Sequence, residues 1–110
     1  MANTFKNAAL ADVSSGSYDT LYTAPSATQV VILGLAITNK TTSAVTVRIQ
    51  FTDTSASTTH QLLHDVSIPA NTTLETLAGQ KYILEATDVL KVQAGTGSAL
   101  DVLLGVMEKS

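Results

Sequence analysis

The stretch from Gln29 to Thr38 constrains the fold of this chain more than any other feature. It reads Gln-Val-Val-Ile-Leu-Gly-Leu-Ala-Ile-Thr, so it is apolar at both odd and even positions and rich in β-branched residues. Such side chains lose χ1 freedom in a helix but suit a pleated sheet. A half-buried strand alternates between apolar and polar residues, whereas a strand covered on both faces need not. We therefore expect a central strand with side chains packed on both faces.

Short strand-like segments separated by turn residues make up the rest of the chain. The clearest period-two pattern is in residues 44–51, where Val45, Val47, Ile49 and Phe51 fall on one face. Further strands are expected at residues 18–23, 60–68, 72–77, 82–84, 89–94 and 99–107. This spacing, with Gly, Pro, Asn and Ser between strands, is typical of an all-β fold. We predict an antiparallel β-sandwich, jelly-roll or immunoglobulin-like, with about eight strands.

The domain organisation follows from the length of the chain. With 110 residues the chain suits one domain. Residues 1–13 carry scattered apolar side chains and are predicted to form an N-terminal arm or edge strand. Residues 14–110 are predicted to form the β-sandwich domain.

Composition excludes several classes of function. Only 14% of the residues are charged, against about 25% in an average soluble domain, which favours association into a homo-oligomer. The net charge of −3 comes without a basic stripe, so nucleic-acid binding is not expected. The longest apolar run is about half the roughly 20 residues that span a bilayer, and no signal peptide is evident, so no membrane partner is expected. The absence of cysteine excludes disulfides and zinc–thiolate sites.

The two histidines, His60 and His64, are four residues apart. On a helix this spacing would form one zinc-binding face, but here both lie in a strand-like segment. On a strand they would be about 13 Å apart, too far for one ion. We expect His60 to be exposed and His64 to be partly buried with a hydrogen-bond partner.

The carboxylates are spread singly along the chain, and no nucleophile elbow is present. Tryptophan is absent and aromatic residues make up 5%, so no sugar-stacking platform is evident. We therefore predict no enzyme, no cofactor and no catalytic or metal site. For Glu85, Asp88 and Asp101 two interpretations stay open. They form a calcium site if their turns converge, or they belong to an acidic turn that is simply solvated.

Large side chains in the N-terminal third are the candidate interface residues. They are Phe5, Leu10, Tyr18 and Tyr22. Exposed aromatic residues on an extended arm would anchor a neighbouring subunit. The alternative is that they cover one end of the sandwich.

Four blocks of the sequence carry a resemblance to a known group of proteins. They are residues 1–8 (Met-Ala-Asn-Thr-Phe-Lys-Asn-Ala), residues 21–28 leading into a strand that ends Ile37-Thr38-Asn39, residues 66–71, and residues 84–92. The chain resembles small virion proteins of tailed bacteriophages that infect marine and freshwater bacteria. The shared motifs are strand ends and turns, and they cover nearly the whole chain.

The resemblance implies a β-sandwich subunit present in many copies in the virion, made in the host cytoplasm. Its partners would be other virion proteins, either the major capsid protein or tail and neck proteins. It implies neither an active site nor a position on the capsid, neck or tail. The competing interpretation is a carbohydrate-binding or host-attachment module of a phage particle, and an enzyme ranks third.

Overall fold

The structure is a computed structural model that describes residues 3–54, 56–75 and 82–109. These residues form nine strands and no helix. The strands are β1 (Asn3–Leu10), β2 (Asp19–Thr23), β3 (Gln29–Asn39), β4 (Val45–Asp53), β5 (Thr58–Ile68), β6 (Thr73–Glu75), β7 (Tyr82–Leu84), β8 (Val89–Ala94) and β9 (Leu100–Lys109). The expected strand over residues 72–77 is described only as far as β6. Since the described residues form strands, turns and loops, they contain no membrane-spanning helix.

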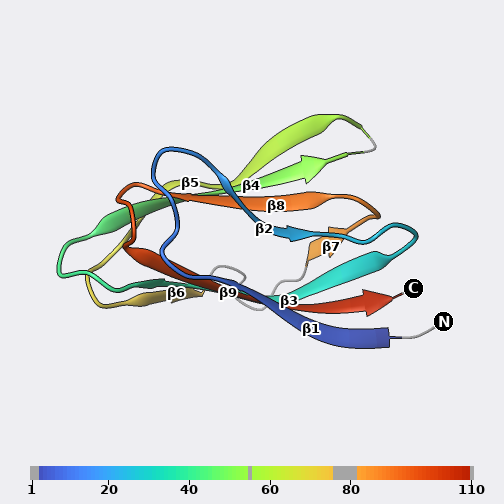
Figure 1. The fold of residues 1–110 in the computed structure, drawn as a ribbon, viewed down its shortest axis with the longest axis horizontal. Helices are drawn as coiled ribbons and strands as arrows, with labels where there is room; N and C mark the ends of the chain where they lie inside the picture. The colour runs from blue at the N-terminus through green and yellow to red at the C-terminus, as the bar shows by residue number, and fades with distance from the viewer. Residues whose placement is uncertain (1–2, 55, 76–81, 110) are drawn as a thin grey trace.

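Two antiparallel sheets pack face to face, which confirms the predicted β-sandwich (Figure 1). One sheet has the order β1-β9-β3-β6, with β7 pairing the same edge of β3 as β6. We call it the β9 sheet. The other, the β4 sheet, has the order β2-β8-β4-β5. If β6 and β7 together count as one position, this is the jelly-roll order, in which the chain passes repeatedly between two four-stranded sheets.

The core lies between the sheets and consists of the inward-facing aliphatic side chains of both. The alternation predicted for residues 44–51 is confirmed, since Val45, Val47 and Ile49 are buried and Phe51 packs against the core. In the other sheet, the single strand β9 contributes four buried residues: Leu100, Val102, Leu104 and Val106. Burial of such side chains contributes about 1.5–3 kcal/mol each.

The prediction that residues 29–38 are packed on both faces is wrong. β3 is central in its sheet, but only one of its faces is covered: Val30 and Ile32 are buried, whereas Leu33 is 43% exposed. A bulge adds Leu33 to the strand between Ile32 and Gly34, so burial passes from even to odd positions and continues with Leu35. Residues 29–38 are therefore apolar at odd and even positions for two reasons. The bulge changes which positions face the core, and the outer face of the strand is apolar as well.

The strand β5 also departs from the expected alternation. Its register with β4 shifts twice, between Val47 and Ile49 and again before Gln50, so β5 carries two extra residues. Asp65 lies in one of these bulges with φ 52°, in the left-handed region. His60 is exposed, as predicted. His64 is exposed as well, so the prediction of its partial burial is wrong: the bulge turns its side chain out of the core.

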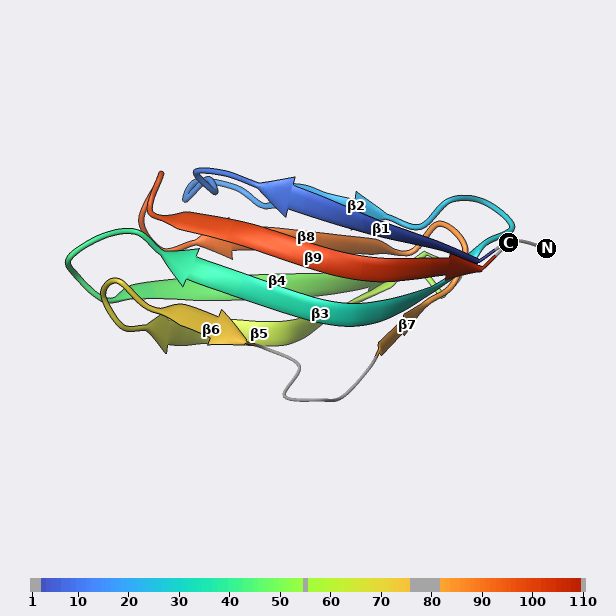
Figure 2. The same ribbon diagram turned by 90° about the horizontal axis from the view of Figure 1, so that it is seen from below.

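The N-terminal strand β1 is an edge strand of the β9 sheet. It pairs with β9 in unbroken register from Asn3↔Lys109 to Leu10↔Val102. Figure 2 shows β1, β9, β3 and β6 side by side in one layer, with the strands of the β4 sheet behind them. Side chains on both outer faces are exposed, among them Leu103 on the β9 sheet and Thr46 on the β4 sheet.

Candidate interaction surfaces

The carboxylates considered for calcium do not come together as expected. Asp101 lies elsewhere, where it accepts a hydrogen bond from Lys40 (2.9 Å). Asp53 takes its place beside Glu85 and Asp88, with carboxylate oxygens within 4.8 Å of one another. Asp88 is buried, and its oxygens accept hydrogen bonds from the backbone amides of Thr54 (3.1 Å) and Glu85 (2.9 Å). Through these bonds Asp88 holds the turn at Thr54 and the turn at Glu85 together.

The four candidate interface residues lie in different parts of the sandwich. Phe5 is 73% exposed on β1. Leu10 is half-buried and packs against the core. The Tyr18 hydroxyl donates to Gln61 (3.4 Å) across the β4 sheet. Tyr22 reaches from β2 to the Glu108 carboxylate on β9. They therefore do not form one patch, and Phe5 is the one that projects from the surface.

Tyr22 belongs to a polar cluster on the side of the sandwich where β1 and β2 lie next to each other. Its hydroxyl donates to Glu108, which also pairs with Lys6 of β1 (3.0 Å). Burial, followed by the contact with Glu108, raises the pKa of Tyr22 above its ordinary value. The Tyr22 hydroxyl, followed by the Lys6 ammonium, lowers the pKa of Glu108. The cluster joins β1 to its neighbour β9 and, across the sandwich, to β2 of the β4 sheet.

The outer face of the β9 sheet is apolar across its strands. The register places Phe5 beside Met107, Met107 beside Val31, and Val31 beside Ile83, so four strands contribute to one row. A second row contains Ala9, Leu103 and Ala36. Several of these side chains are strongly exposed: Phe5 73%, Ile83 63%, Leu103 55%. We call this surface, with Leu33, the apolar face.

Two glycines separate the rows. Gly34 of β3 pairs with Gly105 of β9, and a Cβ added to either would meet no atom within 4 Å. The result is a shallow depression of about 250 Å³, bordered by Asn7, Ala36, Glu75 and Leu103. The apolar face therefore has relief: large side chains on both sides of a strip of bare backbone.

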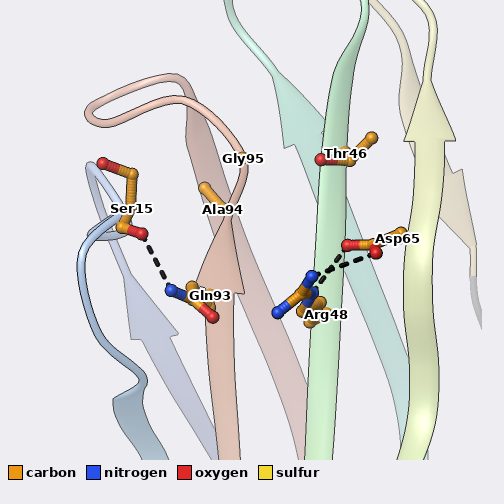
Figure 3. A pocket seen from close by; sticks show the side chains of 7 residues that line it. All are labelled: Ser15, Thr46, Arg48, Asp65, Gln93, Ala94 and Gly95. Carbon is orange, nitrogen blue, oxygen red and sulfur yellow. Dashed lines mark hydrogen bonds and ion pairs between the residues drawn. The ribbon is translucent and has the colours of Figure 1, made fainter.

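The outer face of the β4 sheet is polar. Along β4 it presents Thr46, Arg48, Gln50 and Thr52. Arg48 is held to Asp65 of β5 by two hydrogen bonds, Nε–Oδ1 at 2.6 Å and Nη2–Oδ2 at 3.0 Å (Figure 3). This contact lowers the pKa of Asp65. The guanidinium holds the β5 bulge against its neighbouring strand.

A polar pocket of about 190 Å³ opens beside this ion pair. It is lined by Ser15, Thr46, Arg48, Asp65, Gln93, Ala94 and Gly95 (Figure 3). Gln93 donates to the Ser15 carbonyl (2.8 Å), and the Gly95 amide donates to the Thr46 carbonyl (2.8 Å). A Cβ added at Gly95 would clash with Thr46 Oγ1, so glycine allows this close approach.

A third hollow of about 250 Å³ lies between the sheets, on the side where β5 faces β7. Its lining includes Phe51, Leu62, Tyr82 and Leu90, with His60 at its margin. It is an apolar continuation of the core. His60 Nε2 lies 3.2 Å from Thr58 Oγ1 on the same strand.

Comparison with known proteins supports the fold. The chain is similar to a protein of Bacillus endospore appendages, which form a family of disulfide-linked pili: TM-score 0.53, 10% identity, covering 96% of this chain and 85% of that one. A structure from the Gx strain of infectious bursal disease virus aligns with TM-score 0.49 and 8% identity over 98% of this chain and 37% of that one. The VP2 subviral particle of that virus aligns with TM-score 0.47 and 12% identity over 96% and 32%.

At these identities the likeness to the pilus protein shows a shared sandwich fold and nothing more. No protein-family model matches the chain. A search of curated proteins also finds no match. A function for this chain must therefore be argued from its own surfaces.

Proposed function

We propose that this chain is a non-enzymatic structural subunit of a virus particle, present in many copies and acting through protein–protein contacts. The observation that carries the proposal is the apolar face of the β9 sheet. A soluble monomer rarely exposes a large contiguous apolar patch, and such patches mark interaction sites. Here Phe5, Ile83 and Leu103 are each more than half exposed on one sheet face.

Three further points support this proposal. Jelly-roll sandwiches build many viral capsid domains. The Bacillus protein with which the fold is shared comes from a pilus, which is itself an assembly. The sequence blocks resemble virion proteins of tailed bacteriophages. We therefore propose a place in a tailed-phage virion, as a capsid decoration or cement protein or as a neck or tail accessory protein. Its partners would be the major capsid protein or tail and neck proteins, and further copies of itself.

The proposal is tested on particles of the virus that encodes the chain. Mass spectrometry of purified particles should find the protein at high copy number, and electron cryo-microscopy should place the sandwich at regularly repeated positions. The apolar face should be covered by a neighbouring protein. Absence of the protein from purified particles would refute the proposal.

The polar pocket of the β4 sheet favours a second candidate, a carbohydrate-binding or host-attachment module. Jelly rolls also occur as lectin domains, and a pocket with guanidinium, carboxylate and amide groups can bind sugar hydroxyls. A glycan array tests this candidate directly. Reproducible binding that is lost in Gln93→Ala, with Leu103→Lys as the matched variant on the opposite face, would favour it over the structural role.

A further inference from the structure

The edges of the two sheets differ in how well they are protected. An edge strand presents unpaired backbone groups, and proteins protect such edges with short strands, bulges, prolines or charges. β6 and β7 border residues 76–81, which lie outside the described part of the chain, so this edge is not compared. β2 has a register shift and ends just before Pro25, and β5 has two bulges.

β1 has no bulge and no proline, and one charged residue. It is eight residues long, and its register with β9 is unbroken. The five consecutive residues from Asn3 to Asn7 are exposed. Its single charged residue, Lys6, is paired with Glu108 of the same chain. β1 is therefore the edge to which another strand is added at the least cost.

We propose that β1 pairs antiparallel with β1 of a second copy of this chain, which joins the two β9 sheets into one continuous sheet. The inference deepens the proposed function, since it names a first contact between copies of a multi-copy subunit. The apolar face supports a sheet extension here, because Phe5 stands at its β1 margin, 73% exposed, and an added strand would give it a neighbour.

The register of this pair follows from the side-chain pattern. Residues directly opposite each other lie on the same face, so odd positions must oppose odd positions. Centring the two-fold axis on Lys6 would oppose like charges, which is destabilising. Centring it on Asn7 opposes Asn7 to Asn7, Phe5 to Ala9 and Lys6 to Ala8. This register uses residues 4–10 of both copies, with alanines opposite Phe5 and Lys6 and with Leu10 opposite Thr4.

The occupant is inferred to be a second copy rather than a peptide of another protein because the side-chain pattern of β1 matches itself. The strand carries no acidic residue, and its lysine is already paired, so its charge gives no preference for an acidic or basic partner. Its own sequence is complementary to itself in the Asn7 register. Such an interface is isologous, as in most two-fold dimers.

Single cysteines test this register because the chain has none of its own. Opposed residues of antiparallel strands have Cα atoms about 4.5–5.5 Å apart, within the range of a disulfide. Asn7→Cys should therefore form a covalent dimer under mild oxidation. Ala9→Cys is the matched control on the same face of β1: in this register its two copies are about 13 Å or more apart and should not cross-link.

A charge variant provides a second test. Asn7→Lys opposes two ammonium groups on the axis and should weaken dimerisation several-fold in sedimentation equilibrium, an effect that shrinks at high salt. Thr59→Lys on the edge strand β5 is the control and should leave the dimer unchanged. Circular dichroism should show both variants folded.

The outcomes separate this inference from the proposed function. Selective cross-linking at Asn7→Cys together with the Asn7→Lys effect supports it. Equal cross-linking at both positions, or a dimer insensitive to Asn7→Lys, overturns it. A chain that is present in particles at high copy number but monomeric in solution, with no Asn7→Cys cross-link, also overturns the strand pairing while leaving the structural role intact.

Discussion

The outer faces of the two sheets present opposite chemistry on one small sandwich. On the apolar face, Phe5, Ile83 and Leu103 are large apolar side chains that no described part of the chain covers. On the β4 sheet, the corresponding positions along β4 are Thr46, Arg48, Gln50 and Thr52. Both outer faces carry exposed side chains, such as Leu103 on one and Thr46 on the other. The difference is therefore in composition, and under the proposed function the β9 sheet is the side expected to contact other proteins.

The two faces also differ in how their polar groups are used. On the β4 sheet, Arg48 and Asp65 satisfy each other, and Gln93 bonds to the Ser15 carbonyl. On the apolar face the depression at Gly34 and Gly105 leaves backbone bare beside large aliphatic side chains. A surface whose polar groups are satisfied is stable in water, whereas exposed apolar area gains free energy when it is covered.

The largest effect is expected for a charge in the centre of the apolar face. Leu103→Lys should reduce incorporation of the protein into particles by about 30-fold or more, because losing a central apolar contact costs about 2 kcal/mol. Since Leu103 is 55% exposed, the free energy of unfolding should change little. Quantitative mass spectrometry of particles made with variant protein measures incorporation.

The matched variant for this prediction is Gln50→Lys on the outer face of β4. It introduces the same charge on the opposite sheet and should leave incorporation unchanged. If both variants were incorporated equally well, the two faces would be equivalent and the comparison would fail.

A smaller effect is expected when the depression is filled. Gly105→Val places a side chain where an added Cβ meets no described atom within 4 Å, so the strand can carry a branched residue there. The free energy of unfolding should rise by about 0.5–1 kcal/mol, because glycine is a poor strand residue. Incorporation should nevertheless fall, by about tenfold, if a partner side chain occupies the depression. A rise in both quantities would show that the depression is not part of the contact.

Much of the fold was predictable from the alternation of apolar residues. The pattern in residues 44–51 appears in the structure as the buried side chains of β4. The bulges were not predictable, because a single extra residue such as Leu33 leaves no mark in a sequence that is apolar on both sides of it. The bulge at Asp65 in β5, which leaves His64 exposed, was not predicted either.

The apolar face was hidden by the same ambiguity. Residues 29–38 predicted a strand covered on both faces, and the structure covers only one. Periodicity reports which positions are apolar, but it does not report whether a second layer exists to cover them. Of the candidate interface residues, Phe5 lies on this face, whereas Tyr22 points to Glu108. The pairing of Phe5 with Met107 depends on strand register, which a single sequence does not determine.

A more modest effect is expected for Tyr22→Phe, which tests how firmly β1 and its share of the apolar face are anchored. The variant loses the hydrogen bond to Glu108 and should lower the free energy of unfolding by about 1 kcal/mol at neutral pH. Because the pKa of Glu108 is lowered in the folded protein, its contribution is present above its unfolded pKa and is lost as pH falls through the folded value. Thermal unfolding between pH 7 and pH 2 should therefore show a weaker acid dependence in the variant. An unchanged acid dependence would argue against this anchor.

The smallest effect is expected on the polar side, for Asp65→Asn. Asparagine tolerates the left-handed backbone at this position (φ 52°), so the bulge is kept while the charge is removed. Arg48 lowers the pKa of Asp65, so the wild type should be slightly more stable near neutral pH, and this advantage should vanish as pH falls through the folded pKa of Asp65. Because both side chains are exposed, water and salt screen their attraction, and the difference in melting temperature should also shrink at high salt. Incorporation into particles should match that of the wild type. A loss of incorporation as large as that of Leu103→Lys would mean that the polar face is also a contact surface. The two sheets would then not differ in their role in assembly.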